Sequence, residues 1–289
     1  MLAVLTLVWG TNWPLFPLAV REVSVWTFRA VAVTIAGLAL LAAARLRGQS
    51  LVVPRRHWRT VLAAAICYLV VWNITSTYAA VLIPSGQAAI LGFTMPLWAA
   101  LLSWAFLGER LNTRMRLAMA LGCIGVGLLV ARGAMAYAQA PLGFALGLLA
   151  GVGWAVGTLI LKRWPVPVPA TVLTGWQLLI CALPFTAGAL AFGDGHWFMP
   201  SWQSIVVIGY IALVPMCVGN VAWFSIVGML PTNVAGLSSI MVPVVAMISG
   251  AIVHGEPLGG LQWAAMACCV GALALALWKP AAIMQASSR

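Results

Sequence analysis

The feature that most limits what this chain can fold into is a series of ten apolar runs, each about as long as a helix that crosses a bilayer. A transmembrane helix needs about 20 predominantly apolar residues. We expect such spans at residues 2–20, 24–44, 60–82, 87–107, 114–132, 142–162, 170–192, 203–227, 233–253 and 260–278. No connection between them is long enough to hold a soluble domain. The sequence therefore predicts an all-α integral membrane protein with ten transmembrane helices.

Composition and charge support a membrane location. The chain is 64% hydrophobic and 7% charged, which is more apolar surface than a soluble protein of 289 residues could bury. The net charge of +11 could indicate nucleic-acid binding, but the basic residues lie in short loops. Twelve of the Lys and Arg residues fall on one side of the predicted spans and two on the other. Because short cytoplasmic loops are enriched in Lys and Arg, we expect both termini in the cytoplasm, the bilayer as partner, and no nucleic acid.

The two halves of the chain carry the same marker residues at a constant spacing of 147 positions. The matched pairs are Pro96 with Pro243, Gly108 with Gly255, Glu109 with Glu256, Leu111 with Leu258, and Asn73 with Asn220. The glutamate match is informative because the chain contains only three glutamates. We therefore expect two repeats, residues 1–138 and 139–289, of five helices each. Because five is odd, the second repeat must be inverted, and secondary transporters of this kind bind substrate between the repeats near mid-membrane.

Uncharged polar and aromatic side chains at mid-span depth are the candidate cavity residues. They are Asn12, Asn73, Tyr78, Thr94, Trp98, Trp154, Thr158, Asn220, Trp223 and Ser239. Amides, hydroxyls and indole faces could hold a zwitterion without a formal counter-charge. The alternative is that hydroxyls join helices and that tryptophans form interfacial belts, the role expected for Trp9, Trp164, Trp197, Trp202 and Trp278. Pro96 and Pro243 are the expected hinges, because proline leaves a helix carbonyl without its usual donor.

The few ionisable groups in or near the spans each allow two interpretations. Arg29 either extends to the outer interface or binds a carboxylate. His254 is either interfacial or proton-sensing, and Glu109 and Glu256 are either helix-end residues bonding loop backbone or gating ion pairs. No span has an acidic residue near its centre, which argues against the usual proton-exchange device and favours facilitated diffusion.

The sequence contains no pattern typical of an enzyme. A phosphate-binding glycine loop, a cluster of metal ligands and a plausible nucleophile–base pair are all missing from it. We therefore expect no enzymatic activity, no cofactor and no metal site.

Several of these residues also carry a family resemblance. Trp9-Gly10 in the first span corresponds to Trp154-Ala155 in the sixth span. The proline pair and the Gly-Glu-x-Leu pair described above also carry the resemblance. In these features the chain resembles the drug/metabolite transporter superfamily, its EamA-type members, and most closely the YddG-type amino-acid exporters of the bacterial inner membrane. The resemblance implies amino-acid efflux by alternating access through a central cavity. Small multidrug-resistance relatives depend on a glutamate in their first span, which this chain lacks, so their proton-coupled mechanism is not carried over.

The sequence therefore predicts an inner-membrane secondary transporter that exports neutral or aromatic amino acids or similar small metabolites. One alternative is an exporter of drugs, nucleosides or other metabolites. Another, from a different class, is a non-transporting membrane scaffold, which would show no flux of any solute and would co-purify with a partner.

Overall fold

The computed structural model describes residues 1–108, 112–193, 199–229, 239, 241–255 and 258–277, and all regular structure in these residues is helical. Eight helical stretches in them are long and apolar enough to cross a membrane. Two shorter apolar helices follow, at the positions predicted for the ninth and tenth spans. The prediction of an all-α membrane fold is confirmed, and the described residues contain eight long apolar helical stretches and two shorter apolar helices of the ten spans predicted.

Five of the predicted spans are single helices. They are α3 (Val25–Leu46), α8 (Thr113–Gln139), α9 (Pro141–Arg163), α10 (Ala170–Phe192) and α15 (Gly260–Leu277). The described part of the ninth span is α14 (Val242–His254). Ser24 begins α3 as its N-cap, with its hydroxyl accepting a hydrogen bond from the Thr27 amide at 3.1 Å. The main difference from the predicted bounds is that α8 extends to Gln139, seven residues further than expected.

The other four spans are interrupted, although we predicted continuous helices. The first consists of α1 (Leu2–Gly10), the 3-10 turn η1 (Trp13–Leu15) and α2 (Phe16–Ala19). The third consists of η2 (Arg55–His57), α4 (Trp58–Ala64), the π-helix η3 (Ala65–Val70) and α5 (Val71–Leu82). The fourth consists of α6 (Ser85–Gly92) and α7 (Met95–Leu107), and the eighth of α11 (Trp202–Ile211), the π-helix η4 (Ala212–Gly219) and α12 (Asn220–Met229). Proline explains two of these breaks, since it lies in the first turn of η1 and of α7.

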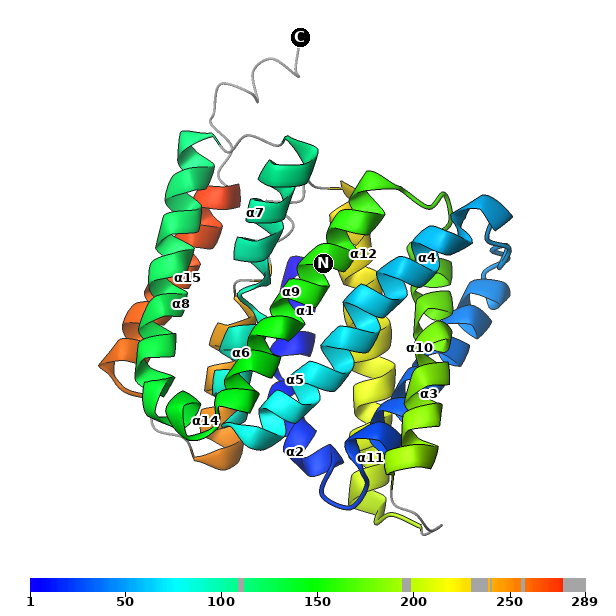
Figure 1. Ribbon diagram of the computed structural model, residues 1–289, viewed down its shortest axis with the longest axis horizontal. Helices are drawn as coiled ribbons and strands as arrows, with labels where there is room; N and C mark the ends of the chain where they lie inside the picture. The colour runs from blue at the N-terminus through cyan, green and yellow to red at the C-terminus, as the bar shows by residue number, and fades with distance from the viewer. Residues whose placement is uncertain (109–111, 194–198, 230–238, 240, 256–257, 278–289) are drawn as a thin grey trace.

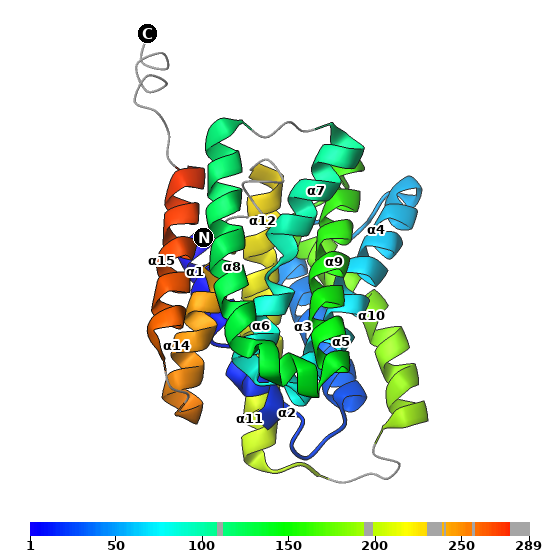
Figure 2. The same cartoon turned by 60° about the vertical axis from the view of Figure 1, so that its left-hand side comes forward.

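The helices are arranged as two flanking pairs around a central group. On one flank α3 packs along α10, and on the other α8 packs along α15, as both views show (Figure 1, Figure 2). Between the flanks, α9 packs against α5, α6 and α7, and α1 packs against α14. The central group therefore brings together helices from both halves of the sequence.

Local distortions recur at the spacing of the sequence repeat. The π-helix η3 begins at Ala65 and η4 begins at Ala212, which are 147 positions apart. The amide nitrogens of Asn73 and Asn220 each donate to the carbonyl four residues earlier, at 2.7 and 2.8 Å. π-Helical segments are frequent at functional sites, and here both lie next to the centre of the bundle.

The repeated glycines end equivalent helices. Gly108 follows α7 with φ +66°, and Gly255 follows α14 with φ +67°. This left-handed conformation favours glycine because a Cβ would be strained there. The Gly-Glu-x-Leu pairs of the sequence therefore contain a helix stop signal, while Glu109, Leu111 and Glu256 lie outside the described residues.

Candidate functional site

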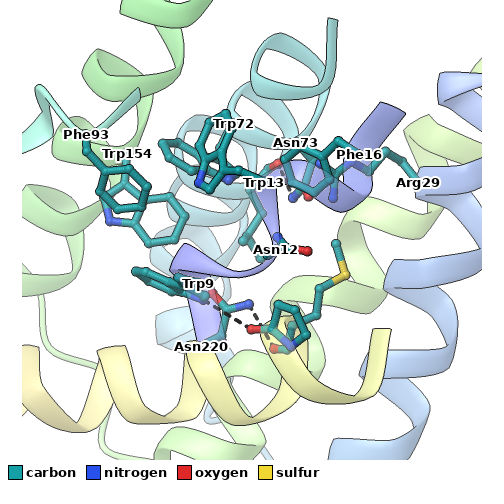
Figure 3. A pocket seen from close by; sticks show the side chains of 13 residues that line it. Trp9, Asn12, Trp13, Phe16, Arg29, Trp72, Asn73, Phe93, Trp154 and Asn220 are labelled. Carbon is teal, nitrogen blue, oxygen red and sulfur yellow. Dashed lines mark hydrogen bonds between the residues drawn. The ribbon is translucent and has the colours of Figure 1, made fainter. Parts of the chain in front are cut away.

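A narrow cavity lies at the centre of the bundle, between helices from both halves (Figure 3). It is lined by Trp9, Asn12, Trp13, Phe16, Arg29, Leu69, Trp72, Asn73, Phe93, Trp154, Pro215, Met216 and Asn220. Its volume is about 40 Å³. Since one buried water needs roughly 10–15 Å³ of such volume, the cavity has room for only a few water molecules. Small-molecule sites usually measure about 300–1,000 Å³, so this conformation must widen before it can hold a substrate.

Six of the thirteen lining residues are aromatic, and Trp154 packs against several of these rings. Its ring centroid lies 5.0 Å from that of Trp9, 4.6 Å from Trp72 and 4.1 Å from Tyr68. Most of these pairs are edge-to-face or tilted, the arrangements that aromatic quadrupoles prefer. Only 3% of Trp154 is exposed, so these rings provide a preformed apolar surface shielded from lipid and water.

The polar atoms of the wall belong to asparagine amides, indole nitrogens, the Arg29 guanidinium and backbone carbonyls. The Tyr68 hydroxyl donates to Oδ1 of Asn220 at 3.0 Å. The Trp9 indole donates to the carbonyl of Pro215 at 3.2 Å, an oxygen made accessible within the π-helix η4. These bonds fix Trp9 and Asn220 in place and connect α1 and η3 to the eighth span.

Within the described part of the chain, four buried polar atoms at or beside the cavity have no hydrogen-bond partner. They are Oδ1 of Asn12, Nη2 of Arg29, and the indole nitrogens of Trp154 and Trp223. Native proteins leave few buried polar groups unpaired, because each one costs roughly 1–3 kcal/mol. One acceptor and three donors at one place are therefore available to a polar ligand.

The burial of Arg29 disagrees with one of its two interpretations, that its side chain extends to the outer interface. Its side chain is only 1% exposed and lines the cavity beside Phe16 (Figure 3). Its Nε donates to Oγ1 of Thr77 at 2.7 Å, and its guanidinium lies over the rings of Phe16 and Phe28, 4.5 and 4.7 Å from their centroids. A hydroxyl and two ring faces hold this cation inside the bundle, so it cannot extend to the membrane surface.

Four of the ten predicted cavity residues line the cavity, namely Asn12, Asn73, Trp154 and Asn220. Trp223 stands directly behind them, with its ring 5.7 Å from that of Trp154. The remaining five are Tyr78, Thr94, Trp98, Thr158 and Ser239, and none of them lines it. The Thr94 hydroxyl donates to the Leu91 carbonyl and accepts from the Trp98 indole, while Thr158 bonds the Trp154 carbonyl. These hydroxyls bond carbonyls three and four residues earlier in their own spans, so these bonds neither face the cavity nor join separate helices.

Sequence reasoning missed most of the aromatic wall. Trp9 was assigned to an interfacial belt, but it is 7% exposed and lies in the wall of the cavity. Trp13, Phe16, Trp72 and Phe93 were not among the predicted cavity residues. A signal was present, because positions 9, 13 and 16 follow one face of a helix in the first span. By contrast, Trp164 and Trp202 are 56% and 70% exposed, as belt residues would be.

The predicted hinge prolines lie at helix starts. Pro96 occupies the first turn of α7, just after the break that separates it from α6, and Pro243 occupies the first turn of α14. Several other candidates cannot be placed: Glu109, Glu256, Trp197, Trp278 and the side chain of His254 lie outside the described residues. Among the residues that the structure does describe, no group of His, Cys, Asp and Glu could hold a metal ion.

Comparison with known proteins identifies the family. The family model described as "EamA-like transporter family" matches the chain twice, at residues 1–131 and 141–278. The chain belongs to the EamA-like transporter family. It is thus a multi-pass membrane transporter of the drug/metabolite transporter superfamily, as the sequence resemblance implied.

Individual relatives agree with this assignment. The chain is 24% identical to the "Uncharacterized transporter YvbV" of Bacillus subtilis (strain 168), over 89% of this chain and 84% of the relative. It is 26% identical to the "Uncharacterized inner membrane transporter YedA" of Escherichia coli (strain K12), over 95% and 88%. The "Probable amino-acid metabolite efflux pump" of Salmonella typhimurium is 31% identical over 63% of each chain.

A solved crystal structure has the same fold. It superposes with a TM-score of 0.72 over 95% of this chain and 96% of its own, at 24% sequence identity. The likeness therefore concerns the architecture of the bundle.

Proposed function

We propose that this transporter exports neutral amino acids, aromatic ones included, or similar small metabolites by alternating access through the central cavity. The observation that carries the proposal is the chemistry of the cavity, where aromatic faces surround unpaired amide, indole and guanidinium groups. Such a wall suits a small molecule with a polar head and an apolar or aromatic body. The relative named as a probable amino-acid metabolite efflux pump supports the same substrate class.

The repeats and the membrane orientation belong to this proposal. We divide the chain into residues 1–138 and 139–289, with the second repeat inverted, and place both termini on the cytoplasmic side. In support, α4 begins and α7, α9 and α12 end at the upper end of the bundle in Figure 1, next to the Arg- and Lys-rich connections. Reporter fusions after Arg47 and after Gly193 test the orientation, with the first expected inside the cell and the second outside.

Two wider hollows lie toward opposite ends of the bundle. One of about 520 Å³ lies beside Lys162, Phe224 and Met229, near the upper ends of α9 and α12. The other, of about 600 Å³, lies beside Pro17 and Pro84, near the lower end of the bundle. The narrow cavity lies at the bundle centre between these two ends, which is the layout that alternating access requires.

The experiment that tests the proposal is flux of labelled phenylalanine and leucine across liposomes that contain the purified protein, with and without a pH gradient. We expect flux without a gradient, because none of the four acidic residues of the chain lies near the centre of a span. Flux only with a gradient would contradict the facilitative mechanism. Flux of nucleosides or planar drugs without any of amino acids would favour the alternative, since aromatic walls also stack on such molecules.

A matched pair of variants connects flux to the cavity. Trp154→Phe removes an indole from the wall, whereas Trp104→Phe makes the same change at a side chain that is 64% exposed on the surface of the bundle. We expect Trp154→Phe to lower flux about two- to tenfold, the range that aromatic contacts are worth, and Trp104→Phe to leave it unchanged. Equal effects of the two variants at equal folded yield would exclude this cavity as the transport site.

A further inference from the structure

Arg29 is a buried cation whose bonds within the protein are incomplete. It lies on α3 with 1% of its surface exposed, and its Nε is held by Thr77. Nη2 of the same guanidinium is buried and has no hydrogen-bond partner among the residues that the structure describes. A guanidinium carries five N–H donors and no acceptor, so two ring faces and one hydroxyl leave part of its capacity unused.

No carboxylate of the described residues compensates this charge. The chain has four acidic residues, at positions 22, 109, 194 and 256, and only the first is among the described residues. Glu22 accepts instead from the amide and hydroxyl of Ser201, at 2.7 and 2.6 Å. An unpaired charge within a membrane span is costly, and such residues usually serve function.

The side chain of Arg29 lines the cavity, so its unpaired N–H donors lie at the cavity wall. The Thr77 hydroxyl that accepts from Nε donates in turn to the carbonyl of Asn73 at 2.6 Å, and Asn73 is itself a lining residue. This chain of bonds fixes the plane of the guanidinium at the Phe16 side of the cavity (Figure 3). The unpaired Oδ1 of Asn12 belongs to the same lining.

We propose that Arg29 binds the carboxylate of the transported molecule, which makes the substrate class carboxylates with an apolar or aromatic body. A guanidinium matches a carboxylate with two parallel N–H donors, which is why arginine is preferred for this role. In an amino acid, the ammonium group pairs with Oδ1 of Asn12 and the indole faces, while the side chain occupies the aromatic wall. This inference rests on the proposed export function but concerns which part of the substrate is recognised.

The test measures the binding of three ligands to the full-length protein in detergent by calorimetry. 3-Phenylpropanoate carries the carboxylate, 3-phenylpropanamide is its neutral isostere, and phenylalanine carries both charges. We expect the wild type to bind the carboxylate and phenylalanine about ten- to a hundredfold more tightly than the amide, as expected for a hydrogen-bonded charge. Equal affinity for the carboxylate and its neutral isostere would overturn the proposal without any variant.

Variants then assign the preference to Arg29. Arg29→Gln is expected to remove the preference for the carboxylate, because the variant loses the positive charge and the paired N–H donors of the guanidinium. Its affinity for the amide should stay within about twofold of the wild-type value. The control is Arg21→Gln, at an exposed position just before α3. A carboxylate preference that survives in folded Arg29→Gln would overturn the assignment.

The two proposals can fail separately. If 3-phenylpropanoate binds in an Arg29-dependent way but no amino acid is transported, Arg29 is the anion-binding residue and the export proposal is wrong. If amino acids are transported equally by the wild type and Arg29→Gln, the export proposal holds and the role of Arg29 is wrong.

Discussion

Individual residues connect the central helices through a small number of buried contacts. The Tyr68 hydroxyl is the donor to Oδ1 of Asn220, and both side chains are almost fully buried. A buried acceptor that loses its donor bears its full desolvation cost. At the scale of single residues, the stability of the fold depends on two conditions. Each buried polar atom needs a hydrogen-bond partner, and each side chain must fit between backbones that pack closely.

Tyr68→Phe should destabilise the folded protein. It removes the donor and leaves the Asn220 oxygen unpaired, which we expect to cost about 1–3 kcal/mol. The control is Tyr210→Phe, because that hydroxyl is exposed and its contact with Thr11 is 3.5 Å long. Thermal unfolding in detergent should show a lower melting temperature for the first variant only. Unchanged melting of Tyr68→Phe would show that the bond contributes little.

Gly157→Ala should destabilise the folded protein by disturbing the contact between α9 and η3. A Cβ at Gly157 would lie 2.1 Å from Cβ of Tyr68 and 2.9 Å from its Cα, so the backbones would have to separate. Overpacking of this kind costs about 1–3 kcal/mol. Gly127→Ala on α8 is the matched control, because no atom lies within 4 Å of the added carbon. We expect reduced melting temperature and folded yield for Gly157→Ala, and equal behaviour of the two would contradict the close packing.

At the scale of elements, the four flanking helices are regular, whereas most of the other spans are interrupted. The helices α3, α8, α9, α10 and α15 run without interruption, whereas the first, third, fourth and eighth spans contain breaks or π-helical turns. In a membrane, irregular backbone is tolerated where it is buried in protein or lines a cavity. The distortions at η3 and η4 adjoin the lining residues Leu69, Asn73 and Asn220, which is consistent with this rule.

Pro96→Ala tests whether the break before α7 acts as a hinge during transport. Proline in the first helical turn removes no intrahelical hydrogen bond, so its loss should change stability by only about 1 kcal/mol or less. We expect the melting temperature to stay nearly constant while the rate of flux changes, because the preset φ of proline no longer restricts the break. Pro184→Ala, at an interior position of α10, is the comparison. If Pro96→Ala transports at the same rate as the wild type, Pro96 is not a hinge residue.

For the whole molecule, the described contacts join the two halves of the chain at the lower end of the bundle as well as at the centre. Glu22, in the connection between α2 and α3, accepts two hydrogen bonds from Ser201, the N-cap of α11. The side-chain bond from Ser201 and then its backbone bond lower the pKa of Glu22 below the ordinary value of 4.5. The carboxylate is therefore ionised and bonded at neutral pH.

Lowering the pH should weaken the connection between Glu22 and Ser201. A carboxyl group with a lower pKa in the folded than in the unfolded state adds stability above its ordinary pKa and loses it as the pH falls through the folded pKa. We expect the wild type to melt at a higher temperature than Glu22→Gln at neutral pH, with the difference vanishing as the pH falls below 4.5. Ser201→Ala should behave like Glu22→Gln. A difference that persists in acid would exclude the carboxylate as its cause.

Hydropathy was sufficient to predict the all-α membrane fold. Long apolar runs must become helices in lipid, because backbone groups there find partners only within their own segment. Span α10 was predicted at residues 170–192 and is observed as Ala170–Phe192. The 147-residue spacing of Asn73 and Asn220 likewise predicted two equivalent positions, and both make the same bond to their own helix.

Only the tertiary structure decided which side chains meet at the centre. Trp9 and Trp154 are 145 positions apart in the sequence, and hydropathy cannot distinguish a tryptophan in a cavity wall from one in an interfacial belt. Thr94 and Thr158 are polar and buried, but each hydroxyl bonds a carbonyl of its own span, which composition does not reveal. Arg29 is the clearest example, since its distance from the membrane surface depends on Phe16, Phe28 and Thr77, which come from three different helices. Helix formation in lipid is a local consequence of sequence, whereas the partners of a buried polar atom are set by contacts between distant segments.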